Sequence, residues 1–93
     1  MPIVSFRCVA TRGIFVGKQV RHFRSVQRSA LRKLAMLEAA TQLEDLRIPP
    51  GNRLELLRGD RAGQHSIRIN DQYRICFSWT RLGPADVEIC DYH

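Results

Sequence analysis

The chain has 93 residues, 44% of them hydrophobic, which indicates one small domain with a single modest core. No stretch approaches the roughly 20 apolar residues that span a bilayer, and the first residues lack the features of a secretory signal, so we expect a cytoplasmic protein without a membrane partner. Cys8, Cys76 and Cys90 lack CxxC spacing, which argues against a zinc site or a disulfide framework and favours buried thiols.

The formal net charge is +6, and the positive charge is concentrated in the first part of the chain. Residues 1–37 contain eight Lys or Arg and no Asp or Glu, whereas residues 38–93 contain seven basic and nine acidic residues. A basic domain of this size most often binds nucleic acid, although the same field would attract an acidic protein.

The first half of the sequence is typical of a short strand followed by helices. Residues 3–6 are apolar and partly β-branched and predict an opening strand, and a brief helical piece is expected at residues 12–16, before Gly17. The clearest element is a helix within residues 19–42. Its expected buried positions recur at steps of three and four residues, and they are Phe23, Gln27, Ala30, Leu34, Leu37 and Thr41, with Val26 beside them.

A basic stripe lies on the opposite side of this expected helix. Arginines recur there at the same steps of three and four, and at about 100° per residue they point away from the apolar face. The stripe is either an RNA-binding surface, with Arg21, Arg24 and Arg28 as its contacts, or a solvated helix face. Its members are Arg21, Arg24, Arg28 and Arg32.

The second half of the sequence predicts a β-sheet. Pro49 and Pro50 lack amide protons and Gly51 permits a turn, so helical structure ends there. Strands are then expected at residues 53–57, 64–69, 73–79 and 86–90, with turns at 58–63 and 82–84.

Alternation within residues 64–79 separates two faces of this sheet. Odd positions are mostly apolar and even positions are polar apart from Cys76, so one face should pack on the core and the other should face solvent. Pairing odd with odd positions needs an odd-length loop such as residues 70–72, which places Arg68 opposite or close to Arg74. Two facing cations repel unless an anion lies between them, so the pair predicts a phosphate site, or else a nearby Asp or Glu accommodates it.

A long ordered pattern covers the second half of the chain: RLELLRGDRAGQHSIRINDQYRICFSW, followed by DYH at the end. It resembles the HigB-type ribosome-dependent mRNA interferases of the RelE/ParE toxin superfamily. The resemblance extends over nearly the whole chain and implies a single RelE-like toxin domain over residues 1–93. The implied fold is α+β, with an N-terminal strand and two or three helices packed on a twisted antiparallel β-sheet whose concave open face holds the active site.

The resemblance also implies which residues form the site. Arg68 and Asp91 are implied as RNA-binding neighbours of the catalytic group. Glu55 stands where some family members have a second active-site histidine, and it is either a general base or a structural partner of Arg53 or Arg58. The implied catalytic residues are His93, Tyr92, Arg74, Arg58 and Glu55.

The chemistry of these residue types fits RNA cleavage without a metal or cofactor. An RNA phosphodiester is cleaved by its own 2′-hydroxyl if a base removes that proton, cations stabilise the charge on phosphorus and an acid protonates the leaving oxygen. His93 suits proton transfer, because an imidazole with a pKa of ~6.5 works in either direction near neutrality. Arg58 and Arg74 would hold the phosphate, and Tyr92 would stack on a base or position the phosphate. The three histidines lack the spacing of metal ligands.

The resemblance implies three partners: a helix-turn-helix, HigA-like antitoxin, the ribosome with its mRNA, and operator DNA reached only through the antitoxin. Two other functions stay open. A ParE-like toxin of the same fold would inhibit DNA gyrase without cleaving anything, but it would not need the proton-transfer pair Tyr92 and His93. An inactive toxin that serves as a DNA-binding co-repressor with its antitoxin stays open because of Glu55.

Overall fold

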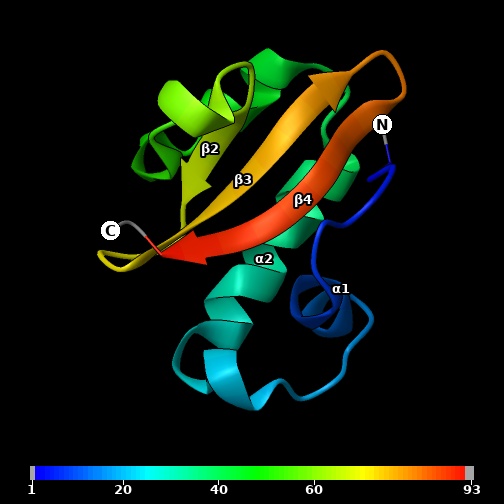
Figure 1. The fold of residues 1–93 in the computed structure, drawn as a ribbon, viewed down its shortest axis with the longest axis vertical. Coiled ribbons are helices and arrows are strands. Elements are labelled where there is room, and N and C mark those ends of the chain that lie inside the picture. The colour runs from blue at the N-terminus through cyan, green and yellow to red at the C-terminus, as the bar shows by residue number, and fades with distance from the viewer. Residues whose placement is uncertain (1, 92–93) are drawn as a thin grey trace.

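The chain forms an α+β fold in which one antiparallel sheet carries helices on one face (Figure 1). The structure is a computed structural model and describes residues 2–91. Each strand pairs with the next one along the chain, so the sheet order is β1-β2-β3-β4. The strands are β1 (Glu55–Leu56), β2 (His65–Arg68), β3 (Tyr73–Thr80) and β4 (Gly83–Asp91).

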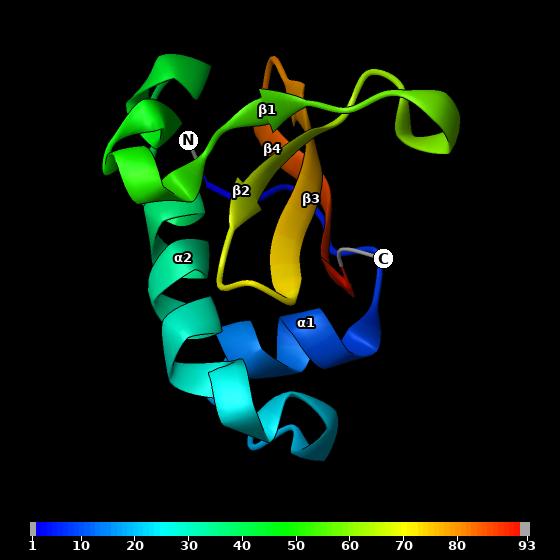
Figure 2. The same cartoon turned by 90° about the vertical axis from the view of Figure 1, so that its left-hand side faces the viewer.

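Two α-helices lie against the same face of the sheet, α2 along the strands and α1 across one end (Figure 2). They are α1 (Val9–Phe15) and α2 (Gln27–Ala39). Among residues 2–91, no helix has the length and apolar character needed to cross a bilayer. Four short 3-10 helices complete the described chain: η1 (Arg21–Val26), η2 (Leu43–Arg47), η3 (Pro50–Asn52) and η4 (Gly59–Arg61).

The helix expected within residues 19–42 is divided into η1 and α2 at Val26, whose φ of −122° is not helical, and Phe23 interrupts η1 with further non-helical angles. Gln27 is only half-buried: its Oε1 accepts from Val20 N at 2.9 Å and its Nε2 donates to Lys18 O at 2.6 Å, so it holds the loop before η1. Thr41 is exposed beyond the end of α2, where its hydroxyl donates to Asp45 at 3.1 Å. The prediction that Gln27 and Thr41 belong to the buried face was therefore wrong.

The opening strand is reduced to one parallel bridge between Phe6 and Val87. The segment still follows β4, since Val87 N donates to Ser5 O at 3.1 Å and Val4 N donates to Pro84 O at 2.7 Å. A β-bulge interrupts β4 beside it, where Asp86 has φ of 52° and donates its amide to Ser5 Oγ at 2.9 Å. The bulge breaks the regular ladder that a longer opening strand would need.

The four strands expected after the Pro-Pro-Gly turn are present in the expected chain order but differ in length. β1 is shorter than expected because Arg53, at φ of 46°, is in the left-handed region and ends η3. β4 begins earlier, at Gly83, since the expected turn residues Gly83 and Pro84 pair with Thr80 and Trp79.

The core lies between the helices and the odd-numbered face of β2 and β3. Ile67 pairs with Ile75, which pairs with Ile89, so the predicted odd-with-odd register is confirmed. Burial of these side chains against the helices supplies most of the hydrophobic stabilisation. The residues with no exposed area in this core include Ile14, Ala30, Leu34, Leu37, Ile67, Ile75, Phe77 and Val87.

Candidate active site

The β2–β3 hairpin brings two arginines side by side on the face of the sheet that the helices leave uncovered. Arg68 and Arg74 are cross-strand partners, as the alternation predicted. The loop between the strands is held by Asn70, whose Oδ1 accepts from Gln72 N at 2.9 Å and Tyr73 N at 2.7 Å. This turn fixes the register, so the two guanidinium groups start from neighbouring backbone positions.

A carboxylate from the same loop accommodates part of the repulsion between these cations. The guanidinium of Arg68 forms an ion pair with Asp71, and the Asp71 side chain is fully exposed. An ion pair this open is screened by water, so an anionic ligand can compete with the carboxylate for Arg68. On the other side of Arg74, its partner on β4 is Cys90.

A polar pocket of about 320 Å³ adjoins this pair of arginines and is lined by Arg53, Glu55, Arg68 and Asp71. Glu55 pairs with Ser66 across β1 and β2, which places it on the same face as Arg68. Arg53 enters the pocket from the left-handed turn that ends η3. Arg53 was not predicted as a site residue; the signal was the Pro-Pro-Gly turn that redirects the chain just before it.

The centre of this uncovered face is not solvent-facing, contrary to the prediction for the even positions. Ser66 and Cys76 are 1% and 0% exposed, and Gln64 is also buried. Leu57, Cys76 and Cys90 form a second, small apolar cluster there. The segment after β1 crosses this face, since Leu57 packs on the two cysteines and Arg61 reaches Glu88 on β4.

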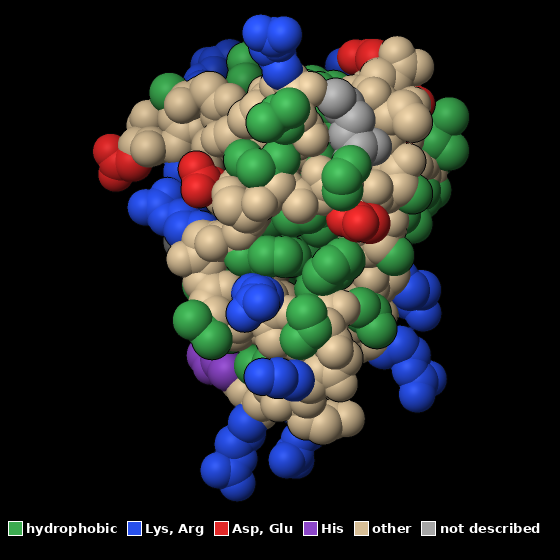
Figure 3. Space-filling model, turned by 90° about the vertical axis from the view of Figure 1, so that its right-hand side faces the viewer, with side chains coloured by type: hydrophobic (Ala, Val, Ile, Leu, Met, Phe, Trp, Pro, Cys, Tyr) green, Lys and Arg blue, Asp and Glu red, His purple; other side chains and the backbone are tan. Residues whose placement is uncertain are grey.

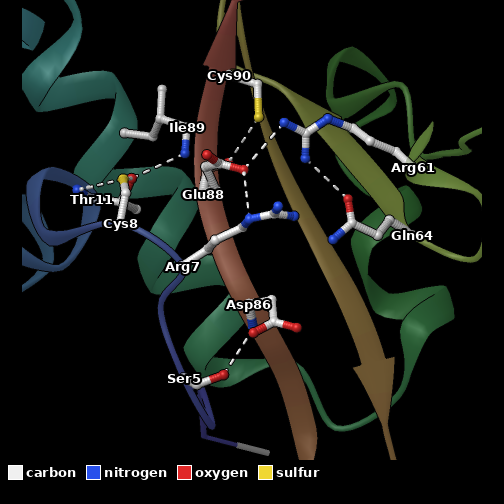
Figure 4. A network of polar contacts seen from close by, with 10 residues as sticks. All are labelled: Ser5, Arg7, Cys8, Thr11, Arg61, Gln64, Asp86, Glu88, Ile89 and Cys90. Carbon is white, nitrogen blue, oxygen red and sulfur yellow. Dashed lines mark hydrogen bonds and ion pairs between the residues drawn. The ribbon is translucent and has the colours of Figure 1, made fainter.

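Arg61 is a guanidinium of this face that the sequence analysis missed. Its Nη2 lies 3.2 Å from Glu88 Oε1 on β4, and its Nη1 donates to Gln64 Oε1 at 3.1 Å (Figure 4). Arg7, from the N-terminal segment, approaches the same Glu88 oxygen at 3.9 Å. The available signal was the alternation of β4, which puts Glu88 opposite Cys76 on the uncovered face.

The two cysteines of the small cluster respond to these cations. A hydrogen bond with Cys90 lowers the pKa of Cys76, burial opposes this effect, and the positive charges of Arg61 and Arg74 lower the pKa further. The same hydrogen bond, together with burial, raises the pKa of Cys90. The positive charges of Arg61 and Arg74 therefore favour the thiolate form of Cys76, and the negative charge of Glu88 opposes it.

Arg58 lies at the far end of the β1–β2 hairpin from Arg68, whereas Asp91 lies on β4, next to the strand that carries Arg74. Leu57 N donates to Gln64 O at 2.8 Å, so Leu57 lies roughly 13 Å along the strands from Arg68, at about 3.3 Å for each residue from Gln64 to Arg68, and Arg58 follows Leu57. Asp91 pairs with Tyr73, and its carboxylate accepts from Gln72 Nε2 at 3.4 Å. The predicted residues Tyr92 and His93 lie outside the described part of the chain.

Comparison with known proteins decides the family. A family model described as the RelE-like toxin of type II toxin-antitoxin system HigB matches residues 15–93. The chain belongs to the HigB-like toxin family. Its described fold is accordingly that of a RelE-like toxin of the HigB type.

Two relatives of this toxin are similar over shorter stretches. Toxin HigB-1 of Vibrio cholerae serotype O1 is 53% identical over 55 residues, which are 59% of this chain and 58% of that protein. An uncharacterized protein of Haemophilus influenzae is 46% identical over 48 residues, which are 52% of this chain and 48% of that protein. The chain thus matches about half of each relative's length.

The basic stripe of this HigB-like toxin lies on the helices and so on the other side of the sheet from Arg74. Arg24 and Arg28 line a groove of about 390 Å³ between α1 and α2, together with Ile14 and Leu31. Figure 3 shows Lys and Arg side chains gathered around this end of the molecule. Arg21 lies in η1, the same short helix that carries Arg24. The role of Arg21, Arg24 and Arg28 in RNA binding stays a prediction.

Proposed function

We propose that this toxin is an endoribonuclease that cleaves mRNA on the ribosome through attack of the RNA 2′-hydroxyl, without a metal ion. The supporting observation is the register that pairs Arg68 with Arg74 on the uncovered face, beside Glu55. Two adjacent guanidinium groups offer forked donors to a phosphodiester and stabilise the additional negative charge of its transition state.

The proton transfers fall to residues around this pair. Arg74 and Arg68 hold the scissile phosphate, and Glu55 accepts the 2′-hydroxyl proton, which is supported by its position on the same face and in one pocket with Arg68. His93 protonates the leaving 5′-oxygen and Tyr92 stacks on a base next to the cut. The products are a 2′,3′-cyclic phosphate, or a 3′-phosphate after its hydrolysis, and a 5′-hydroxyl.

The proposal includes three macromolecular partners. The ribosome presents a messenger as a single strand, which a shallow polar pocket of about 320 Å³ can receive and a duplex would not enter. A helix-turn-helix antitoxin neutralises the toxin, and operator DNA is bound only through that antitoxin. Arg21, Arg24 and Arg28 add electrostatic attraction for ribosomal RNA on the helical side.

Mapping mRNA 5′ ends after tightly controlled expression tests this function. We expect cuts that are in frame with the codons and leave 5′-hydroxyl groups, and far fewer of them for Arg74→Ala. Arg81→Ala is the matched control, because Arg81 is exposed at the opposite end of β3. DNA damage with intact transcripts would instead identify a gyrase inhibitor, and growth inhibition with neither effect would reject both activities.

The role of Glu55 needs a separate measurement. If its carboxylate is the general base, Glu55→Gln should lower the cleavage rate and remove the acidic limb of the pH–rate profile, because the amide cannot accept a proton near neutrality. The unfolding free energy should change little, since Glu55 is exposed. A variant that keeps both the rate and the profile would assign Glu55 a structural role.

A further inference from the structure

The loop between β1 and β2 has few contacts of its own to hold it. Residues 58–60, 62 and 63 are exposed, and both glycines have positive φ, 66° at Gly59 and 90° at Gly63. The backbone hydrogen bonds of the loop are local: Arg61 N donates to Arg58 O at 3.4 Å and Ala62 N to Gly59 O at 3.1 Å. Short turns of this kind open readily unless a side chain anchors them.

Arg61 is the one half-buried residue among residues 58–63, and its side chain reaches across the sheet. One nitrogen of the fork meets Glu88 at 3.2 Å and another donates to Gln64 at 3.1 Å, so the loop is tied both to β4 and to the start of β2 (Figure 4). Glu88 is itself only 23% exposed in its side chain, so this ion pair is less screened than one in open solvent.

Arg58 and Arg61 occupy the two ends of this turn. The 3-10 helix η4 begins directly after Arg58 and ends at Arg61, and the Arg61 amide bonds back to the Arg58 carbonyl. Fixing Arg61 on Glu88 therefore restricts the position of Arg58, whose exposed side chain has no other anchor on the sheet among the contacts of residues 2–91.

We propose that Arg61 is a positioning residue for RNA cleavage: its ion pair with Glu88 holds the 58–63 loop on the uncovered face and sets the place from which Arg58 reaches the RNA. The inference rests on the proposed endoribonuclease function. It assigns Glu88 a matching role, because loss of its charge would leave Arg61 and Arg7 repelling each other.

The shape of the guanidinium matters as well as its charge. Two different nitrogens of Arg61 contact two different partners, Glu88 and Gln64, and the single ammonium of a lysine cannot reproduce that fork. The cleavage rate of Arg61→Lys should therefore lie between those of the unaltered protein and Arg61→Gln.

The test combines RNA cleavage with amide hydrogen exchange in the full chain. Cleavage of a defined mRNA on purified ribosomes is measured for Arg61→Gln, Arg61→Lys, Glu88→Gln, Arg58→Ala and the double variant Arg61→Gln with Arg58→Ala. The control is Arg47→Gln, which breaks another Arg–Glu ion pair, between Arg47 and Glu44 at 2.6 Å on η2. Exchange of the Ala62 and Gln64 amides and the melting temperature are recorded for each.

We expect Arg61→Gln to lower the cleavage rate by about 10²-fold, as a small misplacement of a substrate-contacting group does. Exchange at Ala62 should become faster, while the melting temperature should match that of Arg47→Gln. Because Arg61 acts through Arg58, adding Arg61→Gln to Arg58→Ala should lower the rate no further.

Three results would overturn the proposal: a wild-type cleavage rate in Arg61→Gln, an additive effect in the double variant, or unchanged exchange in the loop. If the unaltered protein cuts no RNA, the proposed function fails instead. The exchange data then still decide whether Arg61 holds the loop.

Discussion

The two faces of the sheet are built from the same strands and are used differently. On the helical face, Ile67, Ile75 and Phe77 are fully buried against α1 and α2. On the other face, alternate residues of the same strands carry Arg68 and Arg74, and the cover consists of a loop and its ion pair rather than helices. Because successive side chains of a strand point to opposite faces, one strand pair makes apolar contacts on one face and polar contacts on the other.

The difference teaches that stability and activity should respond to different positions of β3. Side chains of the helical face lose hydrophobic burial and leave a cavity when shortened. Side chains near the hairpin tip on the other face are partly solvated, so their loss mainly removes charge and hydrogen-bond donors. Substitutions at adjacent residues of one strand can therefore test the separation directly.

The largest expected effect is on the helical face. Phe77→Ala should lower the free energy of unfolding by about 3–5 kcal/mol, because it removes a fully buried ring. Urea denaturation followed by circular dichroism measures the change. If the loss is below that of a surface substitution, the helical face is not the source of stability, and the comparison of the faces fails.

The next effect is on activity. Arg74→Ala should reduce RNA cleavage by about 10²–10³-fold, the usual result of removing one donor to a developing negative charge. The cleavage rate of Arg74→Lys should lie between those of the unaltered protein and Arg74→Ala, since an ammonium lacks the forked geometry. Steady-state cleavage rates and urea denaturation of the same samples are compared; a loss of stability as large as that of Phe77→Ala would contradict the separation.

A smaller effect on stability is expected in the small apolar cluster on the face of the sheet opposite the helices. Cys76→Ala removes one buried sulfur from the cluster with Leu57 and Cys90, and by comparison with Ile→Val changes it should cost about 0.5–1.5 kcal/mol. Differential scanning calorimetry against the unaltered protein measures it. A cost equal to that of Phe77→Ala would show that the small cluster is a second core rather than a local cover.

The smallest effect concerns pH. Burial, with the nearby charge of Arg47, lowers the pKa of His65, whose ring stacks on Phe77 with centroids 6.3 Å apart. The unfolded chain then binds the proton more readily, so the stability present above an unfolded pKa of about 6.5 is lost as pH falls through the lower folded pKa. In His65→Phe, the free energy of unfolding should depend less on pH between pH 7 and 5, which urea midpoints measure.

Alternation alone was enough to predict much of the sheet. It gave the odd-with-odd register and the pairing of Arg68 with Arg74, since a shift by one residue would move the apolar side chains to the other face. It could not give the kink at Phe23, because a 3-10 turn and an α-helix bury similar sets of side chains over six residues.

The burial of side chains on the face without helices was also not predicted from the sequence. The contact between Arg61 and Glu88 joins residues far apart in sequence, and no local propensity encodes it. Polar even positions suggested solvent, but Gln64 and Ser66 are buried because the loop after β1 turns back over them. Only the tertiary path of that loop decides whether a small polar residue on a strand faces water.

The bulge at Asp86 makes β4 tolerant of a change in length at one point. Ala85 pairs with Ser78 and Glu88 with Cys76, so β4 uses two residues where β3 uses only Phe77. Deleting Asp86 would restore a continuous ladder and leave Glu88 and Cys90 on their present side, whereas a one-residue insertion or deletion between Val87 and Cys90 would exchange the two sides for every following side chain. Variation in length among related chains should therefore accumulate at this position and be excluded from the rest of the strand.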